Sequence, residues 1–157
     1  MNGRIILIIL LVLFFISCPS TPPPFSIEKP AGFAIAESKD GGLYSAVSPE
    51  GIIFGIKTAE NYPVKDIEFW SDALKNQFIN NGYQLYKEEE LLIENGSKGI
   101  YFEWLAPYSS STYIYLTFIT VKGDNIVIAE AAGEVKLFAN YREAILESIK
   151  SITFNLD

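Results

Sequence analysis

The stretch Thr112–Val121 (TYIYLTFITV) carries apolar side chains at both its odd and its even positions. Because side chains alternate between the two faces of a β-strand, a strand with this pattern needs cover on both faces. The chain has 157 residues, of which 49% are apolar, enough for one packed core but not for two domains. These features predict a single domain built on a sheet that is buried from both sides.

Two segments with helical periodicity are available to provide that cover. In the segment that follows Asp66, apolar residues recur at steps of three or four, and Gly82 comes directly after its end. Aspartate is one of the residues that cap helix starts, so Asp66 marks the first turn. A second amphipathic segment runs from about Val135 to Lys150. The two apolar stripes consist of Ile67, Trp70, Leu74 and Phe78, and of Phe138, Tyr141, Ile145 and Ile149.

The pattern of the remaining chain predicts short strands at residues 32–38, 43–47, 52–58, 83–93, 99–106, 112–121, 125–134 and 151–156. The acidic run Glu88–Glu90 is expected to interrupt or fray its strand. Tight turns at Ser48–Gly51, Asn95–Gly96 and Lys122–Asn125 keep the connections short, which favours an antiparallel meander. The expected fold class is therefore α+β: an antiparallel sheet with one long helix on each face, an α/β/α sandwich.

The N-terminus has a separate pattern. The apolar run Ile5–Ile16 is twelve residues long, too short to span a bilayer, which takes about 20, but suited to a signal peptide. The segment Phe15-Ile16-Ser17-Cys18 resembles the lipobox of bacterial lipoproteins, although phenylalanine stands where leucine is usual. This resemblance implies that residues 1–17 are cleaved off between Ser17 and Cys18, and that Cys18 carries diacylglyceryl and palmitate groups. The alternative is a free buried cysteine beside a signal anchor.

Residues 18–30 are expected to form a tether between the lipidated cysteine and a folded domain at 31–157. Five prolines between Pro19 and Pro30 favour an extended polyproline-II spacer. Ser26–Lys29 matches the S-x-x-K motif of penicillin-recognising enzymes. That motif needs a helix, which the flanking prolines oppose, and its companion motifs S-D-N and K-T-G are absent from the sequence.

Several segments of the predicted domain resemble the PsbP-like family, which includes the extrinsic PsbP subunit of photosystem II and many small bacterial lipoproteins. The segments are PAGFAIAES, AVSPEGIIFGIKT, IEFWSDAL and IVIAEAAGE followed by LFANYREAILESIKSI, and together they extend from Pro30 to Phe154. The resemblance implies a PsbP-like fold and a non-enzymatic binding or accessory role. The metal-binding histidines associated with PsbP cannot be transferred, because this chain contains no histidine.

The residue inventory leaves little catalytic chemistry. Without histidine, and with the only cysteine assigned to lipid, catalytic triads and ordinary zinc sites are excluded, and no cofactor is expected. Glu88 and Glu90 would lie ~6.6 Å apart on a strand, within the range of glycosidase carboxylates. An acidic run beside Lys87 is more typical of a solvated strand edge. Glu88 and Glu90 therefore remain weak candidates for catalysis or for binding a hard cation.

Aromatic residues crowd one expected hairpin. Trp104 shares its parity with apolar neighbours and is expected in the core, whereas Tyr101, Tyr108 and Tyr113 are candidate partner-binding residues, since interfaces favour tyrosine.

The formal net charge of −7 argues against nucleic acid as a partner. The sequence predicts a lipid-anchored, non-enzymatic accessory protein at the cell membrane or outer membrane. It is expected to face the periplasm or exterior and to bind an envelope protein. The alternatives are an envelope structural component without a specific ligand and, less favoured, a carboxylate-dependent enzyme or a weak cation-binding protein.

Overall fold

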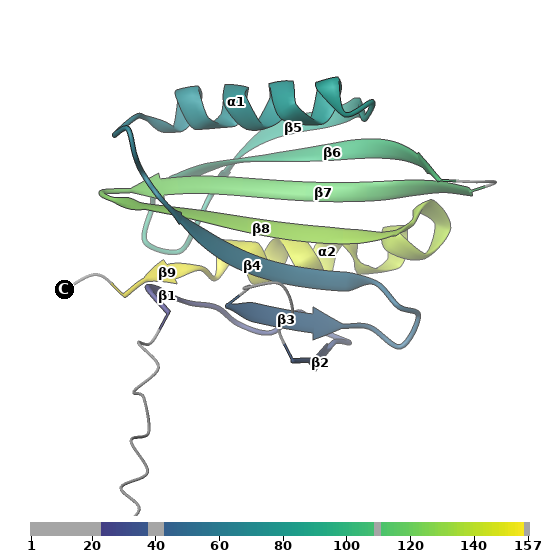
Figure 1. Ribbon diagram of the computed structural model, residues 1–157. Coiled ribbons are helices and arrows are strands. Elements are labelled where there is room, and N and C mark those ends of the chain that lie inside the picture. The colour runs from purple at the N-terminus through teal and green to yellow at the C-terminus, as the bar shows by residue number, and fades with distance from the viewer. Residues whose placement is uncertain (1–22, 38–42, 109–110, 156–157) are drawn as a thin grey trace, which may run out of the picture.

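The computed structural model describes residues 23–37, 43–108 and 111–155. The expected signal peptide, Ser17 and Cys18 lie outside the described residues. Helix α1 (Ile67–Asn80) covers one face of a large sheet and helix α2 (Val135–Lys150) covers the other (Figure 1). The expected α+β architecture with one long helix on each face is confirmed.

The large sheet has seven antiparallel strands in the order β2-β3-β4-β8-β7-β6-β5. Their bounds are β2 (Ala34–Ile35), β3 (Tyr44–Val47), β4 (Ile53–Glu60), β5 (Gln84–Leu92), β6 (Lys98–Tyr108), β7 (Ser111–Lys122) and β8 (Asn125–Glu134). Strands β5 to β8 form the expected meander. Strand β4 pairs with β8 rather than with β5, because α1 carries the chain from β4 across the sheet to its far edge.

Strand β5 is continuous through the acidic run, so the expected interruption is wrong. Glu88 pairs with Phe102, Glu89 with Tyr101 and Glu90 with Ile100 in unbroken register. The one irregularity in the pairing of β5 with β6 is a shift between Leu85 and Lys87. The acidic run is tolerated because β5 is the edge strand and its three carboxylates lie at the surface.

Each face of the sheet carries its own core. Under α1, Phe78 stacks on Trp104 with ring centroids 4.9 Å apart, and Trp104 is completely buried, as expected. Under α2, Phe138, Ile145 and Ile149 are completely buried against the other face. The two-sided apolar pattern of β7 therefore serves both cores.

The first helix begins and ends as its sequence predicts. The Asp66 carboxylate accepts a hydrogen bond from the Phe69 amide at 2.9 Å, which caps the helix start. Gly82 follows the C-terminal end with a φ of 84°, a left-handed conformation that glycine adopts without strain.

The folded part starts earlier than Ala31. Strand β1 (Phe25–Ser26) pairs with β9 (Thr153–Phe154) in a separate two-stranded sheet, and Phe25 is 2% exposed. The backbone of Glu28 accepts a hydrogen bond from the Ser148 hydroxyl, and its amide donates to the Ser151 hydroxyl. The predicted boundary after Pro30 is therefore wrong, because the apolar Phe25 belongs to the core under α2.

Candidate functional site

The two acidic candidate residues lie on the edge strand, where lysines neutralise them. Glu88 accepts from Lys75 of α1 at 2.9 Å, and Glu90 lies 2.9 Å from Lys98 of β6. Both carboxylates are partly or largely exposed, and neither lines the two hollows described below. The structure therefore does not bring Glu88 and Glu90 together over either hollow.

The tyrosine candidates do not form one surface. Tyr101 is 1% exposed on the α2 face of β6, and its hydroxyl donates to Glu89 at 2.9 Å, so its assignment to a partner surface is wrong. Tyr113 has the opposite parity relative to the sheet and is half-buried. Tyr108 is the last residue of β6 and pairs with Ser111. Its side chain is not among those described, so its assignment to a partner surface stays a prediction. Strand parity therefore separates Tyr101 from Tyr113.

One row of residues across the sheet shows how far the cover of α1 reaches. The row pairs Leu85 with Trp104, Trp104 with Tyr115, Tyr115 with Ala132, and Ala132 with Ile53, so all five side chains share one face. Trp104 is completely buried beneath α1, whereas Ile53 is 58% exposed. Helix α1 thus covers β5, β6, β7 and the start of β8, where Ile126 is 3% exposed, and leaves β2, β3, β4 and the C-terminal end of β8 open on this face.

The open half forms a shallow hollow of about 640 Å³ that we name the open sheet face. Small and aliphatic residues make up most of its lining, and Glu37, Lys57 and Glu130 are its charged members. The lining residues are Ala36, Glu37, Tyr44, Ser45, Val47, Ile53, Gly55, Ile56, Lys57, Tyr115, Glu130, Ala131 and Ala132.

One ion pair and one phenol give the open sheet face its polar character. Lys57 of β4 donates to the Glu130 carboxylate of β8 at 2.8 Å. Tyr115 lies next to this pair, and burial, with a further contribution from Glu130, raises the pKa of its phenol. Tyr115 therefore stays neutral and can donate a hydrogen bond at the margin of an otherwise apolar surface.

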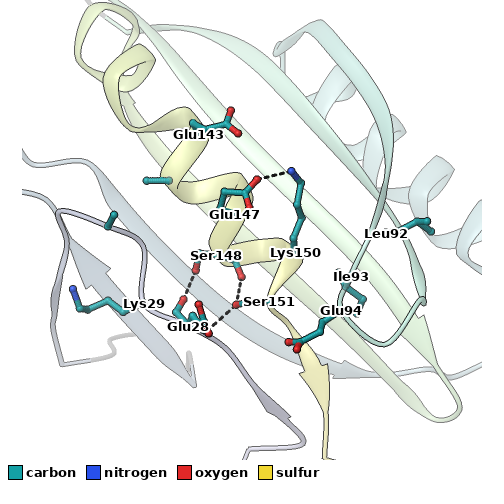
Figure 2. Close-up of a pocket in the computed structure, with 12 residues that line it drawn as sticks. Glu28, Lys29, Leu92, Ile93, Glu94, Glu143, Glu147, Ser148, Lys150 and Ser151 are labelled. Carbon is teal, nitrogen blue, oxygen red and sulfur yellow. Dashed lines mark hydrogen bonds and ion pairs between the residues drawn. The ribbon is translucent and has the colours of Figure 1, made fainter.

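A second hollow, of about 600 Å³, lies beside the C-terminal half of α2 (Figure 2). The N-terminal segment borders it on one side and the β5–β6 turn on the other, and Glu28, Glu94, Glu143 and Glu147 bring four carboxylates to it. We name it the acidic hollow.

One of the two lysines that line the acidic hollow pairs with a carboxylate, and the other is held by the backbone. Lys150 pairs with Glu147 at 2.6 Å, and its pKa is raised by Glu147 first and by Glu143 to a smaller extent. Lys29 donates to the Phe33 carbonyl at 2.6 Å. The acidic hollow can attract a cationic group, but within the described residues no group of three or more acidic, histidine or cysteine side chains is arranged to hold a metal ion.

Sequence reasoning missed the open sheet face. The apolar alternation of β4 predicts that Phe54 and Ile56 are buried, and it leaves Ile53 on the opposite face without saying whether a helix covers it. The available signal was the width of the cover: a helix that runs along the strands, as α1 does (Figure 1), is about 10–12 Å across and covers two or three strands spaced about 4.8 Å apart, too few for a seven-stranded face. In the part of the chain that is described, no helix is long and apolar enough to cross a membrane.

Comparison with solved structures identifies the fold. LpqN of Mycobacterium tuberculosis, described as involved in cell envelope biogenesis, superposes with a TM-score of 0.65 at 11% identity over 82% of each chain. The cyanobacterial PsbP protein CyanoP of Synechocystis sp. PCC 6803 has a TM-score of 0.59 at 9% identity, with 83% of this chain and 86% of that chain covered.

A protein from Bacteroides thetaiotaomicron matches with a TM-score of 0.57 at 16% identity, over 88% of this chain and 47% of that one. No protein-family model matches the sequence, and no curated protein matches it. The likeness to LpqN and CyanoP shows that the protein has a PsbP-like fold, as the sequence resemblance implies. At these identities, the likeness concerns the fold alone.

Proposed function

We propose that this protein is a lipid-anchored accessory protein of the bacterial cell envelope, which presents a non-enzymatic binding domain at a membrane surface. The lipobox-like segment Phe15–Cys18 and the apolar run before it support the anchor. The likeness in fold to LpqN, a protein involved in cell envelope biogenesis, supports a location in the envelope. The lysine pairing of Glu88 and Glu90 disfavours the carboxylate-dependent enzyme.

The observation that carries the proposal is the short distance along the chain between the anchor and the fold. Phe25 is buried and paired with Phe154, seven positions after Cys18. At no more than about 3.6 Å per residue, that segment reaches at most about 25 Å. A lipid on Cys18 would thus hold the domain directly against the membrane surface rather than at the end of a long stalk.

The open sheet face is the surface where an envelope protein would bind. A largely apolar face with an exposed isoleucine in a regular strand favours a protein or peptide partner over a small charged substrate. A helix from the partner, packed beside α1, would give the β2–β3–β4–β8 half the same cover that α1 gives the other half.

The lipid anchor is tested by metabolic labelling. Cells that express the full chain are grown with radiolabelled palmitate, and the labelled protein is followed on gels. We expect incorporation in the wild type and in the neighbouring control Ser20→Ala, and its loss in Cys18→Ala. Incorporation that persists in Cys18→Ala would overturn the anchor.

The partner surface is tested by crosslinking in intact cells. Ile53 and Ile79 are both exposed isoleucines, but only Ile53 lies on the open sheet face. We expect Ile53→Glu to lose the crosslinked partner and Ile79→Glu to keep it, with both variants folded. Equal crosslinking of the two variants to the partner would exclude the open sheet face as the binding surface. An abundant wild-type protein that crosslinks to nothing would favour the structural component.

A further inference from the structure

The loop between β4 and α1 presents apolar side chains to solvent. Tyr62 is 78% exposed and Val64 is 68% exposed, and at the start of α1 Phe69 is 45% exposed. Scattered single apolar residues on a surface are ordinary, but these three fall within eight positions, in one loop and the first turn of the helix that follows it. We name Tyr62, Val64 and Phe69 the apolar tip.

Hydrogen bonds from the Asn61 side chain hold the loop that carries the tip in place. Asn61 is 3% exposed, and its side-chain amide donates to the carbonyls of Lys65 and Gly123 at 3.1 and 2.9 Å. Its side-chain oxygen accepts from the Lys65 amide at 3.0 Å and from the Trp70 indole at 2.7 Å. Four hydrogen bonds of one buried side chain thus fix the conformation of the loop. In this conformation Tyr62 and Val64 are exposed.

The apolar tip lies at the same end of the molecule as the point where the N-terminal segment enters the fold (Figure 1). The backbone amide of Asn61 donates a hydrogen bond to the backbone carbonyl of Asp124 in the β7–β8 turn, at 2.8 Å. Lys122, the last residue of β7, places its ammonium 5.5 Å from the ring centre of Phe154 in β9, the partner strand of β1. A continuous chain of contacts therefore joins the tip to β1, the first described strand after Cys18.

We propose that the apolar tip inserts into the interfacial region of the membrane that holds the lipid anchor, and so orients the domain. This inference rests on the proposed function, since it needs the anchor within about 25 Å of Phe25. Tyrosine favours the membrane–water interface, because its ring is apolar while its hydroxyl stays in water, and phenylalanine adds apolar area that can be buried among the acyl chains.

Two features point to a lipid surface as the binding partner of the apolar tip. The chain between Cys18 and β1 is short, and it enters the fold at the same end of the molecule as the tip. The surroundings of the tip contain Lys65 and Lys122 together with Glu60, Asp66 and Asp124, so the area is not basic. Insertion must then be driven by apolar burial, and it does not depend on anionic lipid. The open sheet face lies across the β2–β3–β4–β8 half of the sheet, away from the tip, and remains available to a partner.

The experiment uses the full lipidated protein reconstituted in phosphatidylcholine vesicles. Since the thiol of Cys18 is blocked by lipid, Val64→Cys provides a single site for a nitroxide label, and Ile79→Cys at the opposite end of α1 is the matched exposed control. We measure the accessibility of each label to oxygen and to a water-soluble nickel complex. We expect a several-fold higher oxygen-to-nickel ratio at position 64 than at 79, unchanged when anionic lipid is added.

Equal ratios at the two positions on membrane-bound protein would overturn the orientation and leave the anchor standing. A high ratio at 64 that appears only with anionic lipid would overturn apolar insertion. A label at 64 that is aqueous in vesicles but shielded in the native envelope would assign the tip to a protein partner instead. Protein that washes off the vesicles would overturn the anchor, and the orientation with it.

Discussion

The guanidinium of Arg142 on α2 donates two hydrogen bonds to the carboxylate of Glu103 on β6, from Nε at 2.7 Å and from Nη2 at 3.0 Å. The Glu103 side chain is 1% exposed, and that of Arg142 is 33% exposed. The guanidinium also lies 5.9 Å from the ring centre of Phe138. This bidentate pair joins the middle of α2 to the sheet, and it is the one ion pair with a fully buried carboxylate among those the described residues form.

Removing one partner of this pair should destabilise the domain strongly. Arg142→Ala leaves the Glu103 charge buried without a partner, which costs about 3–5 kcal/mol of the free energy of unfolding. Lys57→Ala, at an exposed pair, should cost no more than about 1 kcal/mol. Urea unfolding measures both values. The double variant Glu103→Leu with Arg142→Met should recover most of the loss, and equal costs for the two single variants would contradict the prediction.

A methyl group added at Gly99 should not fit. Its Cβ would lie 2.2 Å from two ring atoms of the buried Phe118, whereas a Cβ at Gly55 meets nothing closer than the Tyr44 carbonyl oxygen at 3.5 Å. We expect Gly99→Ala to lower the free energy of unfolding by about 1–3 kcal/mol. Gly55→Ala should be neutral or stabilising, because glycine weakens strand interiors. Thermal unfolding of the two variants distinguishes them. A Gly99→Ala variant that is as stable as the wild type would show that Phe118 moves aside freely.

Loss of the Tyr44 hydroxyl should leave stability unchanged or raise it. This hydroxyl is buried with no hydrogen-bond partner in the described structure, and burial raises the pKa of Tyr44. Tyr44→Phe removes an unsatisfied polar group whose burial costs about 1–3 kcal/mol. Tyr101→Phe instead removes a hydrogen bond to Glu89 and should destabilise. Urea midpoints measure both, and a destabilised Tyr44→Phe would indicate that the hydroxyl has a partner in solution.

The contact between Glu50 and Tyr141 should make stability depend on pH in the acidic range. The hydrogen bond that Tyr141 donates lowers the pKa of Glu50 below its ordinary value of 4.5. The carboxylate therefore adds stability above its unfolded-state pKa, and that stability is lost as the pH falls through the folded-state pKa.

Melting temperatures of the wild type and of Tyr141→Phe, followed from pH 7 downward, check this dependence. We expect the wild type to melt higher at pH 7 and the difference to vanish once Glu50 is protonated. A difference that is the same at pH 7 and in strong acid would contradict the role of Glu50.

The elements themselves could be predicted because their signals are local. Asp66 and Gly82 delimit the first helix, and the alternation of Ile114 and Leu116 with Tyr113 and Tyr115 marks a strand that needs cover on both faces. The buried pair could not be assigned in the same way. A carboxylate at Glu103, inside a strand expected to be buried, signals that a cationic partner exists, but its spacing does not identify Arg142.

Local signals were enough for both helices, for most of the strands and for the two-sided core, since periodicity and capping act over a few residues, and the PsbP-like fold followed from the resemblance in sequence. Long-range contacts had to be seen to know that β4 joins β8, that Phe25 belongs to the folded part, and that no described helix covers Ile53. Pairing of Ile53 with Ala132 joins residues far apart in the sequence. Such contacts form because the whole chain buries its apolar surface at once, and no local pattern records which strands become neighbours.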